Sequence, residues 1–311
     1  MIGAAQLEML WERSDPSTEL LRRFGFASGD QAATWAVRML AEDYGLGVVR
    51  VDRLVMSAHN LMFWVSVRTT GPLMIKVCRL AAAHDSLSAR GALVRWLAHR
   101  DLPVASPLLA RGGDHQLLRD DRSIGVQPVL LGDLLDASDL GQVRAAGSTL
   151  ASLHTQLATW PEAKLLEDVR PVQGGNGLPL APEDPRQAAL SDLRSRIEER
   201  TSSLPELPRQ PVHADFRGAN VLARSGSITG VIDFEEARID TAMVDLEHAT
   251  CLLGTWYHDW KPMSPEARTA FLESYSARRP LTEEEQTCLP VIIARYMFGL
   301  SWWDEARRWL A

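Results

Sequence analysis

The sequence of 311 residues contains few cysteines and no long apolar run. Its three cysteines, Cys78, Cys251 and Cys288, are odd in number and widely spaced, so they predict neither a disulfide framework nor a zinc site. The longest apolar stretch, residues 289–303, is interrupted by Arg295 and is shorter than the ~20 residues of a membrane helix. The N-terminal residues lack the basic and apolar regions of a secretory signal. We therefore expect a reducing, cytoplasmic location without a membrane partner.

The chain also lacks a basic excess. Its 33 basic and 40 acidic residues give a net charge of −7, whereas nucleic-acid binders usually carry positive charge. We therefore expect no nucleic-acid partner. Residues 201–311 are the more acidic part, with 16 acidic and 11 basic residues. This imbalance fits a cationic ligand, but it fits an ordinary solvated surface equally well.

Lysine is scarce, with three lysines against thirty arginines. Lys164 lies in a polar stretch, and Lys261 precedes a proline. Lys76, in contrast, lies inside the apolar, strand-like run of residues 73–78, where a charged side chain needs a partner or a function. Lys76 is therefore a candidate functional residue.

The hydrophobic pattern changes along the chain and predicts two lobes. Residues 1–46 read as helical, with Gly45 and Gly47 closing the helical pattern. Three β-rich runs then predict an antiparallel meander, and a helix, a strand pair and a further short strand follow. In order, these segments are residues 48–55, 61–68, 73–78, 87–99, 108–110 with 115–118, and 124–129.

The second half of the sequence is mainly helical. Helices are expected over residues 140–157 and 188–200 and through most of 244–311, with a loop rich in proline and glycine at 168–186. The predicted fold class is α+β and bilobal, with a small β-rich N-terminal lobe and a larger helical C-terminal lobe. The expected divisions are an N-terminal lobe with a helical extension (1–124), a hinge linker (125–132) and a catalytic and substrate lobe (133–311).

The most informative stretch is PVHADFRGANVL at residues 211–222. It contains His213-x-Asp215-x4-Asn220, the spacing of a kinase catalytic loop. Phosphoryl transfer needs an oxygen acceptor near the attacking hydroxyl and a nearby oxygen ligand for Mg²⁺. Asp215 and Asn220 supply these two groups. A surface loop with an N-capping aspartate is the alternative interpretation.

The residues after this loop favour the kinase interpretation. A tight hairpin is predicted from residues 221–224 and 228–232 around Ser225-Gly226-Ser227. Because a hairpin returns the chain to its starting level, Asp233 is expected beside Asn220. Asp233 also follows an apolar pair, and a buried carboxylate there needs a partner such as a metal ion. An isolated surface loop does not explain this convergence.

The segment HADFRGANVLARSGSITGVIDFEEAR resembles the HGDLHxxNVL and IDFxxA signatures of the aminoglycoside phosphotransferase, choline kinase and homoserine kinase superfamily. These enzymes are small-molecule kinases with a protein-kinase-like fold. The resemblance extends over most of the chain and includes LASLH at residues 150–154 and the Asp245-Leu246 pair. Short strings such as RRPLTEEEQTCLPVIIARY are most similar to the homoserine kinases of this superfamily.

The resemblance implies roles for five residues in or around residues 211–222, which we call the catalytic segment. Asp215 would be the catalytic base or the group that orients the acceptor hydroxyl. Asn220 and Asp233 would bind Mg²⁺. His213 and Asp245 would support the catalytic loop structurally.

The resemblance also implies a nucleotide site for ATP, or for GTP. Lys76 would contact the α- and β-phosphates. Ser57 and Asn60 belong to the loop expected to cover the phosphates. Gln127 and Val129 would belong to the linker whose backbone binds the base.

Three features depart from the superfamily pattern. The expected phosphate loop, residues 56–61, has no glycine. The segment of residues 79–100 contains one acid, Asp85, and Arg90 lies near the place where a glutamate partner of Lys76 is expected. Ala214 replaces the glycine that follows the histidine of the signature.

The leading hypothesis is a Mg²⁺-dependent kinase that phosphorylates a hydroxyl of a small, amine-bearing molecule of the aminoglycoside, homoserine or choline type. Two alternatives remain: a kinase acting on Ser or Thr of a peptide in natural-product biosynthesis, and a catalytically weak nucleotide-binding scaffold. Acidic and aromatic side chains near the catalytic segment are candidates for binding the acceptor. They are Glu235, Glu236, Asp240, Glu247, Asp259, Glu273, Trp256, Tyr257, Trp260, Trp302 and Trp303.

Overall fold

The computed structural model describes residues 6–167, 187–257 and 260–310. The chain divides into two compact units, Met1–Leu131 and Gly132–Ala311, and each is a mixture of helices and strands. Within the described residues no helix is long and apolar enough to cross a membrane. The cysteines are thiols buried in the fold. The loop predicted at residues 168–186 lies outside the described residues.

The N-terminal unit is built on a six-stranded sheet with the order β1-β2-β3-β4-β6-β5. The strands β2, β3, β4 and β6 are antiparallel neighbours, which confirms the predicted meander. Side chains alternate between buried and accessible positions along β3 and β4, because one face of the sheet meets the core. The strand bounds are β1 Gln6–Met9, β2 Val48–Met56, β3 Asn60–Val67, β4 Gly71–Cys78, β5 Leu117–Arg119 and β6 Arg122–Pro128.

The beginning of the chain differs from the helical prediction. Residues 6–9 form β1, which pairs in parallel with β2. Leu7 and Met9 pack against the core of the unit, and Glu8 forms an ion pair with Arg53 on β2 at 2.8 Å. Four residues are too few to show a helical or strand period, so this segment follows the edge of β2 rather than its own sequence pattern.

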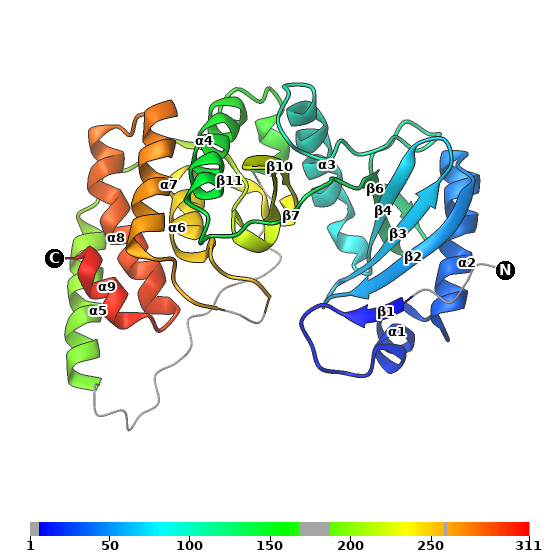
Figure 1. Cartoon of the computed structure of the whole chain (residues 1–311), viewed down its shortest axis with the longest axis horizontal. Helices are drawn as coiled ribbons and strands as arrows, with labels where there is room; N and C mark the ends of the chain where they lie inside the picture. The colour runs from blue at the N-terminus through cyan, green and yellow to red at the C-terminus, as the bar shows by residue number, and fades with distance from the viewer. Residues whose placement is uncertain (1–5, 168–186, 258–259, 311) are drawn as a thin grey trace. The chain divides into compact units, whose positions relative to one another are not determined.

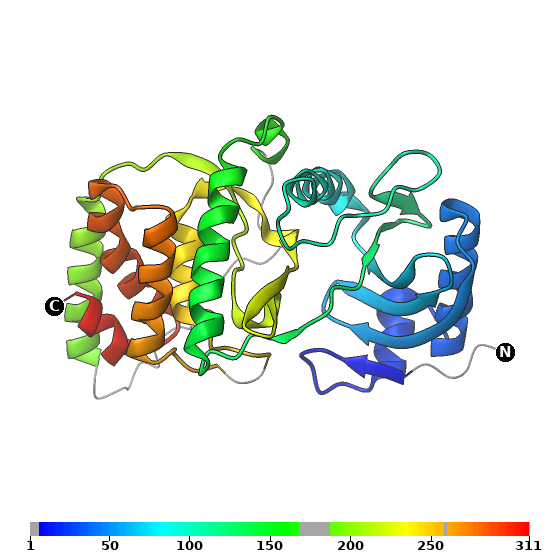
Figure 2. The ribbon, with the colours of Figure 1, turned by 45° about the horizontal axis from the view of Figure 1, so that its top comes forward.

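Two helices cover one face of this sheet. α1 (Pro16–Phe24) begins after the N-cap Asp15, and α2 (Gly29–Met39) begins after the N-cap Ser28. A π-helical turn (Leu40–Tyr44) then ends at Gly45, whose φ of 69° suits glycine. Their buried side chains join those of β2, β3 and β4 in one core. α3 (His84–Ala98) lies on the other side of the sheet in Figures 1 and 2.

The predicted strand pair at residues 108–110 and 115–118 is wrong. The structure forms a hairpin between β5 and β6, and residues 108–110 are not a strand. The turn consists of Asp120 and Asp121, with φ values of 50° and 55°. Positive φ at both central positions is typical of a type I′ hairpin turn, which aspartate tolerates. The prediction relied on Gly112 and Gly113 as the turn and therefore placed it too early.

The C-terminal unit contains two small sheets and a group of helices (Figure 1). The strand pair β9–β10 confirms the predicted hairpin, and α4 has the predicted bounds. One sheet has the order β10-β9-β7, and the other pairs β11 with β8. The strands are β7 Asp133–Leu134, β8 Arg209–Val212, β9 Val221–Arg224, β10 Ser227–Val231 and β11 Arg238–Thr241. The helices are α4 Leu140–Leu157, α5 Gln187–Ser202, α6 Met243–Leu252, α7 Pro265–Arg278, α8 Glu283–Gly299 and α9 Trp303–Trp309.

Helices α4 and α7 pack closely against each other in this unit. Phe271 and Tyr275 of α7 are fully buried. A Cβ on Gly147 of α4 would approach the Phe271 carbonyl oxygen to 2.4 Å, so the two helix backbones meet at this glycine.

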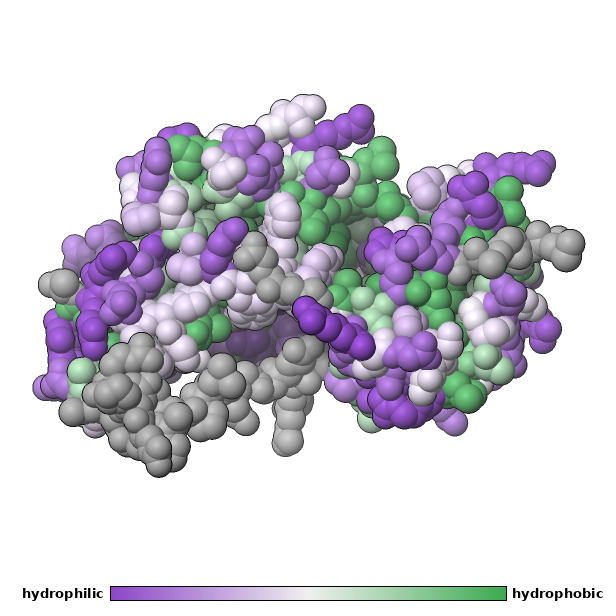
Figure 3. Space-filling view, turned by 60° about the horizontal axis from the view of Figure 1, so that its bottom comes forward, coloured by the Kyte–Doolittle hydropathy of each residue, from purple (hydrophilic) through white to green (hydrophobic). Residues whose placement is uncertain are grey.

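On the face drawn in Figure 3 the surface is largely hydrophilic, with apolar side chains in scattered patches.

Candidate active site

The centre of the site is the segment between β8 and β9. A short 3₁₀ turn (Gly218–Asn220) leads into β9 and places Asn220 beside Asp215. The Asn220 Nδ2 donates to the Asp215 carboxylate Oδ2 at 2.7 Å and to the Asp215 backbone oxygen at 3.0 Å. Because Nδ2 makes both contacts, the amide oxygen of Asn220 is left for another group.

The hairpin β9–β10 returns the chain to Asn220, as the sequence predicts. Val231 pairs with Val221, and the Ile232 N–H donates to the Asn220 backbone oxygen at 3.0 Å. The next residue, Asp233, has a left-handed backbone with φ of 65°. Such a conformation is uncommon outside glycine and is concentrated at turns and functional sites. The structure thus brings Asp215, Asn220 and Asp233 together.

Asp245, on α6, fixes the backbone of the catalytic segment. Its fully buried carboxylate accepts hydrogen bonds from the backbone N–H groups of His213 at 2.8 Å and Ala214 at 2.5 Å. The pKa of Asp245 is lowered: desolvation by burial opposes ionisation, but the contacts with His154 and the His213 region outweigh it. These contacts support the predicted structural role of Asp245.

The two buried histidines of the site are held by different partners. His213 Nε2 lies 3.0 Å from the Ile232 backbone oxygen, which ties the start of the catalytic segment to the end of β10. Burial lowers the pKa of His213, so the ring is neutral and acts as a structural hydrogen-bonding group. His154, on α4, contacts Asp245 Oδ2 at 3.0 Å and the Tyr275 hydroxyl at 2.7 Å. This role of His154 is not predicted by the sequence.

Arg217 is a second residue that the sequence analysis missed. Its Nε lies 3.1 Å from the Asp215 carboxylate. Burial raises the pKa of Asp215 to about 7, Arg217 opposes this rise, and Asp233 adds to it. The sequence shows that an arginine follows the candidate catalytic aspartate by two residues. It does not show that the arginine side chain points towards that aspartate, because this depends on the turn at Gly218–Asn220.

The residue types at this site fit a hard cation such as Mg²⁺. One carboxylate and one amide oxygen, completed by substrate phosphates and water, are a common magnesium ligand set. Asn220 and Asp233 supply these two groups, and the amide oxygen of Asn220 is not used by Asp215. Among the described residues, no group of three or more His, Cys, Asp or Glu side chains could hold a metal by itself. This finding agrees with a magnesium site in which the protein supplies two ligands and phosphate oxygens and water supply the others.

The predicted nucleotide residues lie on the sheet of the N-terminal unit. Lys76 is on β4, between the fully buried residues Ile75 and Val77. Ser57 and Asn60 form the turn between β2 and β3, where the Ser57 N–H donates to the Asn60 oxygen at 2.8 Å. The Ser57 hydroxyl accepts from the Asn60 N–H at 3.3 Å, so the Ser57 side chain and the backbone of both residues hold a tight turn without glycine.

The predicted base-binding linker needs one adjustment. The Val129 N–H donates to the Pro72 oxygen at 3.1 Å, and Gln127 lies opposite Met74 of β4. Because backbone groups alternate in direction along a strand, the backbones of Gln127 and Val129 face β4. The Val126 oxygen accepts from the Leu108 N–H and therefore faces away. The next residues whose backbone groups face away from β4 are Pro128 and Leu130.

The candidate acceptor residues occupy different environments in the C-terminal unit. Glu235 and Glu236 follow Asp233 in a 3₁₀ turn, and Asp240 forms an ion pair with Arg238 at 3.1 Å. Glu247 is 6% exposed, whereas Glu273 is exposed. Asp259 lies outside the described residues.

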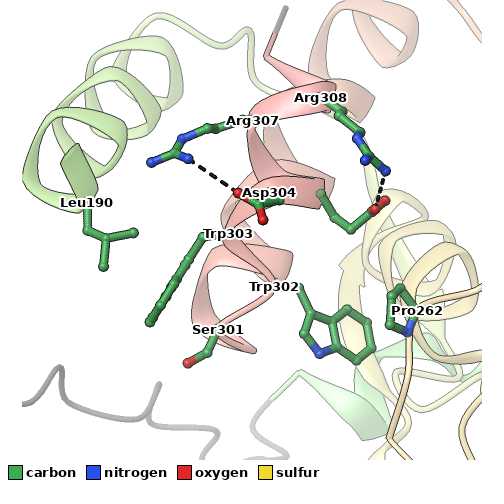
Figure 4. A pocket seen from close by; sticks show the side chains of 9 residues that line it. Leu190, Pro262, Ser301, Trp302, Trp303, Asp304, Arg307 and Arg308 are labelled. Atoms are coloured by element: carbon green, nitrogen blue, oxygen red, sulfur yellow. Dashed lines mark hydrogen bonds and ion pairs between the residues drawn. The ribbon is translucent and has the colours of Figure 1, made fainter. Parts of the chain in front are cut away.

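The tryptophans expected near the acceptor are partly exposed. Trp256 and Trp260 are 41% and 45% exposed, and each ring N–H donates to a backbone oxygen. Trp302 and Trp303 line a pocket of ≈ 420 Å³ together with Leu190, Pro262 and α9 (Figure 4). The charged residues at this pocket are paired, Arg307 with Asp304 and Arg308 with Glu305. The pocket is therefore a second aromatic environment in the unit, without a contact to the catalytic segment in its lining.

Comparison with known proteins identifies the family. Residues 52–285 match the model of the phosphotransferase enzyme family, APH, and the chain belongs to this family. It is 27% identical over 206 residues to a homoserine kinase of Gluconobacter oxydans (strain 621H), covering 64% of each chain. It is 30% identical over 229 residues to a homoserine kinase of Polaromonas naphthalenivorans (strain CJ2), covering 68% of this chain and 69% of the relative. The chain thus spans less than two thirds of the Gluconobacter enzyme.

Solved structures show the same fold. An amicoumacin kinase in complex with AMP-PNP, Ca²⁺ and Ami matches with a TM-score of 0.68 at 15% identity, covering 91% of this chain and 86% of that chain. A microcompartment-associated aminopropanol kinase matches with a TM-score of 0.64 at 19% identity, covering 89% and 93%. The α+β fold is therefore of the protein-kinase-like type, as the resemblance implied.

Proposed function

We propose that the protein is a Mg²⁺-dependent kinase that transfers the γ-phosphoryl group of ATP, or of GTP, to a hydroxyl of a small amine-bearing molecule. The observation that carries this proposal is the convergence of Asp215, Asn220 and Asp233, with the direct contact of Asn220 to Asp215 at 2.7 Å. Family membership and the homoserine kinase relatives support it.

The catalytic segment is suited to receive the proton of the acceptor. In the proposed step the acceptor oxygen bonds to the γ-phosphorus, the bond from that phosphorus to the bridging oxygen of the nucleoside diphosphate breaks, and the hydroxyl proton passes to the Asp215 carboxylate. Arg217 and Asn220 orient that carboxylate through contacts at 3.1 Å and 2.7 Å. When bound, Mg²⁺ neutralises charge on the phosphates, and the oxygens of Asn220 and Asp233 hold it. Asp245 and His213 keep the segment in place.

The N-terminal unit provides the nucleotide contacts. Lys76 on β4 is proposed to bind the α- and β-phosphates, and the Ser57–Asn60 turn to lie over them. We propose that the base binds to the outward-facing carbonyl of Pro128 and N–H of Leu130. The backbone groups of Gln127 and Val129, which the sequence predicted for this role, face β4 instead. A carbonyl and an N–H two residues apart on one strand edge match the donor and acceptor of an adenine edge.

The acceptor is proposed to bind in the C-terminal unit, where the acidic candidates lie. A peptide acceptor and a nucleotide-binding scaffold without turnover are the alternatives. The absence of glycine in the Ser57–Asn60 turn favours the scaffold, whereas the intact trio of Asp215, Asn220 and Asp233 favours the enzyme. The cytoplasmic location and the absence of a nucleic-acid partner stay predictions.

Thermal unfolding with ATP and Mg²⁺, and with GTP and Mg²⁺, tests the nucleotide site. A nucleotide at a hundred times its dissociation constant stabilises the fold by about 2.7 kcal/mol. We expect a Mg²⁺-dependent increase in Tm for the wild type with one of the two nucleotides and a much smaller increase for Asp233→Asn. Equal increases in both proteins, or an increase that does not need Mg²⁺, would contradict the proposed metal ligand.

A further inference from the structure

The turn between β2 and β3 closes through a side chain as well as through the backbone. The Ser57 N–H donates to the Asn60 oxygen at 2.8 Å, as in an ordinary hairpin. The return contact runs from the Asn60 N–H to the Ser57 hydroxyl at 3.3 Å. The carbonyl group of Ser57 is used by a residue outside the turn.

Two arginines bind successive carbonyl groups of this turn. Arg23 on α1 donates from Nη1 to the Ser57 oxygen at 3.0 Å. Arg79, which directly follows β4, donates from Nε to the Ala58 oxygen at 3.2 Å. The backbone N–H of Arg79 donates to the His59 oxygen at 3.0 Å. The carbonyl groups of all four turn residues are therefore bound by donors of the N-terminal unit itself.

Arg23 is held in a fixed orientation by two acids. Its side chain is 8% exposed and forms ion pairs with Glu12 and Glu19. A guanidinium group presents its donors in a rigid, planar fork, so two ion pairs also fix the direction of the third contact. The contact with Ser57 is that third contact. Arg23 therefore holds the Ser57 carbonyl group in one direction.

The two arginine contacts set the direction of two backbone N–H groups. In a trans peptide the N–H points opposite to the carbonyl of the same peptide unit, and no cis peptide bond occurs among the described residues. The Ala58 N–H therefore points away from Arg23, and the His59 N–H points away from the Arg79 side chain. Neither N–H has a hydrogen-bond partner in the described part of the chain. Successive N–H groups at a turn are suited to bind an anion.

Lys76 projects away from the same core as the Ala58 N–H. Ile75 and Val77, its neighbours on β4, belong to the core that α1 helps to form. Because side chains alternate along a strand, Lys76 projects from the other face of the sheet. The Ala58 N–H points away from α1 and therefore also away from this core. The turn thus offers N–H donors outside the core, where Lys76 is proposed to bind phosphates.

We propose that Arg23 and Arg79 are positioning residues of the nucleotide site, which hold the turn so that the N–H groups of Ala58 and His59 bind a phosphate of the nucleotide. This inference rests on the proposed kinase function and specifies how its phosphate turn works without glycine. Glycine gives a phosphate-binding loop its conformational freedom. In this turn, hydrogen bonds from two arginine side chains fix the required orientation instead.

Arg79→Gln tests the proposal, because it removes an exposed side chain and leaves the backbone contact with His59 in place. Isothermal titration calorimetry measures the dissociation constants of ADP with Mg²⁺ and of adenosine. We expect the constant for ADP to rise by about tenfold, as for the weakening of one hydrogen bond to a charged group. The constant for adenosine is expected to stay the same, whereas general damage to the site would weaken both ligands equally.

High salt separates the orientation of the turn from attraction by the Arg79 charge. At 1 M NaCl the Debye length is about 3 Å, so attraction through space is largely screened, whereas the direction of the N–H groups is unaffected. The ratio of the ADP constants of Arg79→Gln and wild type is therefore expected to persist. A ratio that falls to one at high salt would overturn the proposed positioning role.

Arg23→Lys tests the second contact with a matched control. Lysine keeps the positive charge but lacks the fork that reaches Ser57, so binding of ADP is again expected to weaken and binding of adenosine to stay the same. Arg22→Gln is the control, because the exposed Arg22 pairs with Glu19 without contacting the turn. This variant is expected to bind both ligands as the wild type does.

The outcomes distinguish this inference from the proposed kinase function. Unchanged ADP constants in Arg79→Gln and Arg23→Lys would overturn the positioning role and leave the kinase function standing. Equal weakening of ADP and adenosine would also overturn it, because the effect would then not concern the phosphates. A wild type that binds neither ADP nor ATP in the presence of Mg²⁺ would overturn both the kinase function and this inference.

Discussion

His154 Nε2 lies 3.0 Å from the Asp245 carboxylate, although the two residues are 91 positions apart along the chain. The Asp245 carboxylate also accepts hydrogen bonds from the backbone N–H groups of His213 and Ala214. The relationship links α4, α6 and the catalytic segment through one buried charge. Its disruption is therefore expected to affect both stability and turnover.

Asp245→Asn removes that charge without changing the size of the side chain. The amide can satisfy only part of the hydrogen bonding, so a backbone N–H or His154 loses its partner. We expect the free energy of unfolding to fall by about 3 kcal/mol, as for breaking a buried pair, and kcat to fall with it. Urea denaturation followed by circular dichroism measures the first effect. A loss below about 0.5 kcal/mol, the range of surface substitutions, would contradict the role assigned to Asp245.

Ala214 occupies a backbone conformation that suits glycine. Its φ is 62°, in the left-handed region, where a Cβ costs about 1–2 kcal/mol. Ala214→Gly removes this strain but also raises the entropy of the unfolded chain by roughly 0.4–1 kcal/mol. We expect a net stabilisation of about 0.5 kcal/mol. Ala145→Gly, within α4, is the matched control and is expected to destabilise by roughly 0.5–1 kcal/mol. Destabilisation by both substitutions to the same extent would show that Ala214 is unstrained.

Gly218 is required by a close approach of two backbones. A Cβ at this position would meet the Leu253 carbonyl oxygen at 2.3 Å, so Gly218→Ala must displace the turn that carries Asn220. Overpacking of this kind costs about 1–3 kcal/mol. We expect a matching loss of stability and a fall in kcat of at least about tenfold, because small shifts of catalytic groups have large effects on rate. Gly299→Ala, where nothing lies within 4 Å of the added Cβ, is expected to leave kcat unchanged and to cost no stability, because alanine suits a helix better than glycine.

Glu247 is expected to make stability depend on pH. Burial raises its pKa to about 8, and the charged groups around it are Arg295, Asp240, Arg238 and Asp245. The folded state then binds more protons than the unfolded state between the unfolded pKa near 4.5 and about 8, so stability falls as pH rises through this window.

Glu247→Gln removes this dependence. The stability of the variant relative to the wild type is expected to increase with pH by up to about 1.4 kcal/mol per unit between pH 5 and 8. Urea denaturation of the two proteins over this range, without nucleotide or acceptor, measures the difference. A constant difference between them would show that Glu247 ionises at its ordinary pKa.

Much of the site could be predicted because it is local in sequence. The spacing of His213, Asp215 and Asn220 and the turn at Ser225-Gly226 define the catalytic segment and the hairpin that follows. These short-range patterns are sufficient to bring Asp233 beside Asn220.

Features that depend on distant partners were not predictable. His154 is an ordinary helix residue until α4 packs near Asp245, and residues 6–9 become a strand only because β2 offers an edge. The direction of the Val129 N–H is fixed by the register of β6 against β4, which no local pattern specifies. The turn at Asp120 and Asp121 was missed because aspartate there adopts the conformation usually expected of glycine.

The most direct test of the proposed function compares the wild type with Asp215→Asn in a phosphoryl-transfer assay. Product is measured by ³¹P NMR after incubation with ATP, Mg²⁺ and L-homoserine or 1-amino-2-propanol. We expect a phosphomonoester of the amino alcohol with the wild type and a rate about 10²–10⁴ lower with Asp215→Asn, the range for loss of a general base. The Mg²⁺-dependent stabilisation by ATP should persist in the variant. Equal rates in the two proteins, or no phosphomonoester from a wild type that binds ATP and Mg²⁺, would contradict the account.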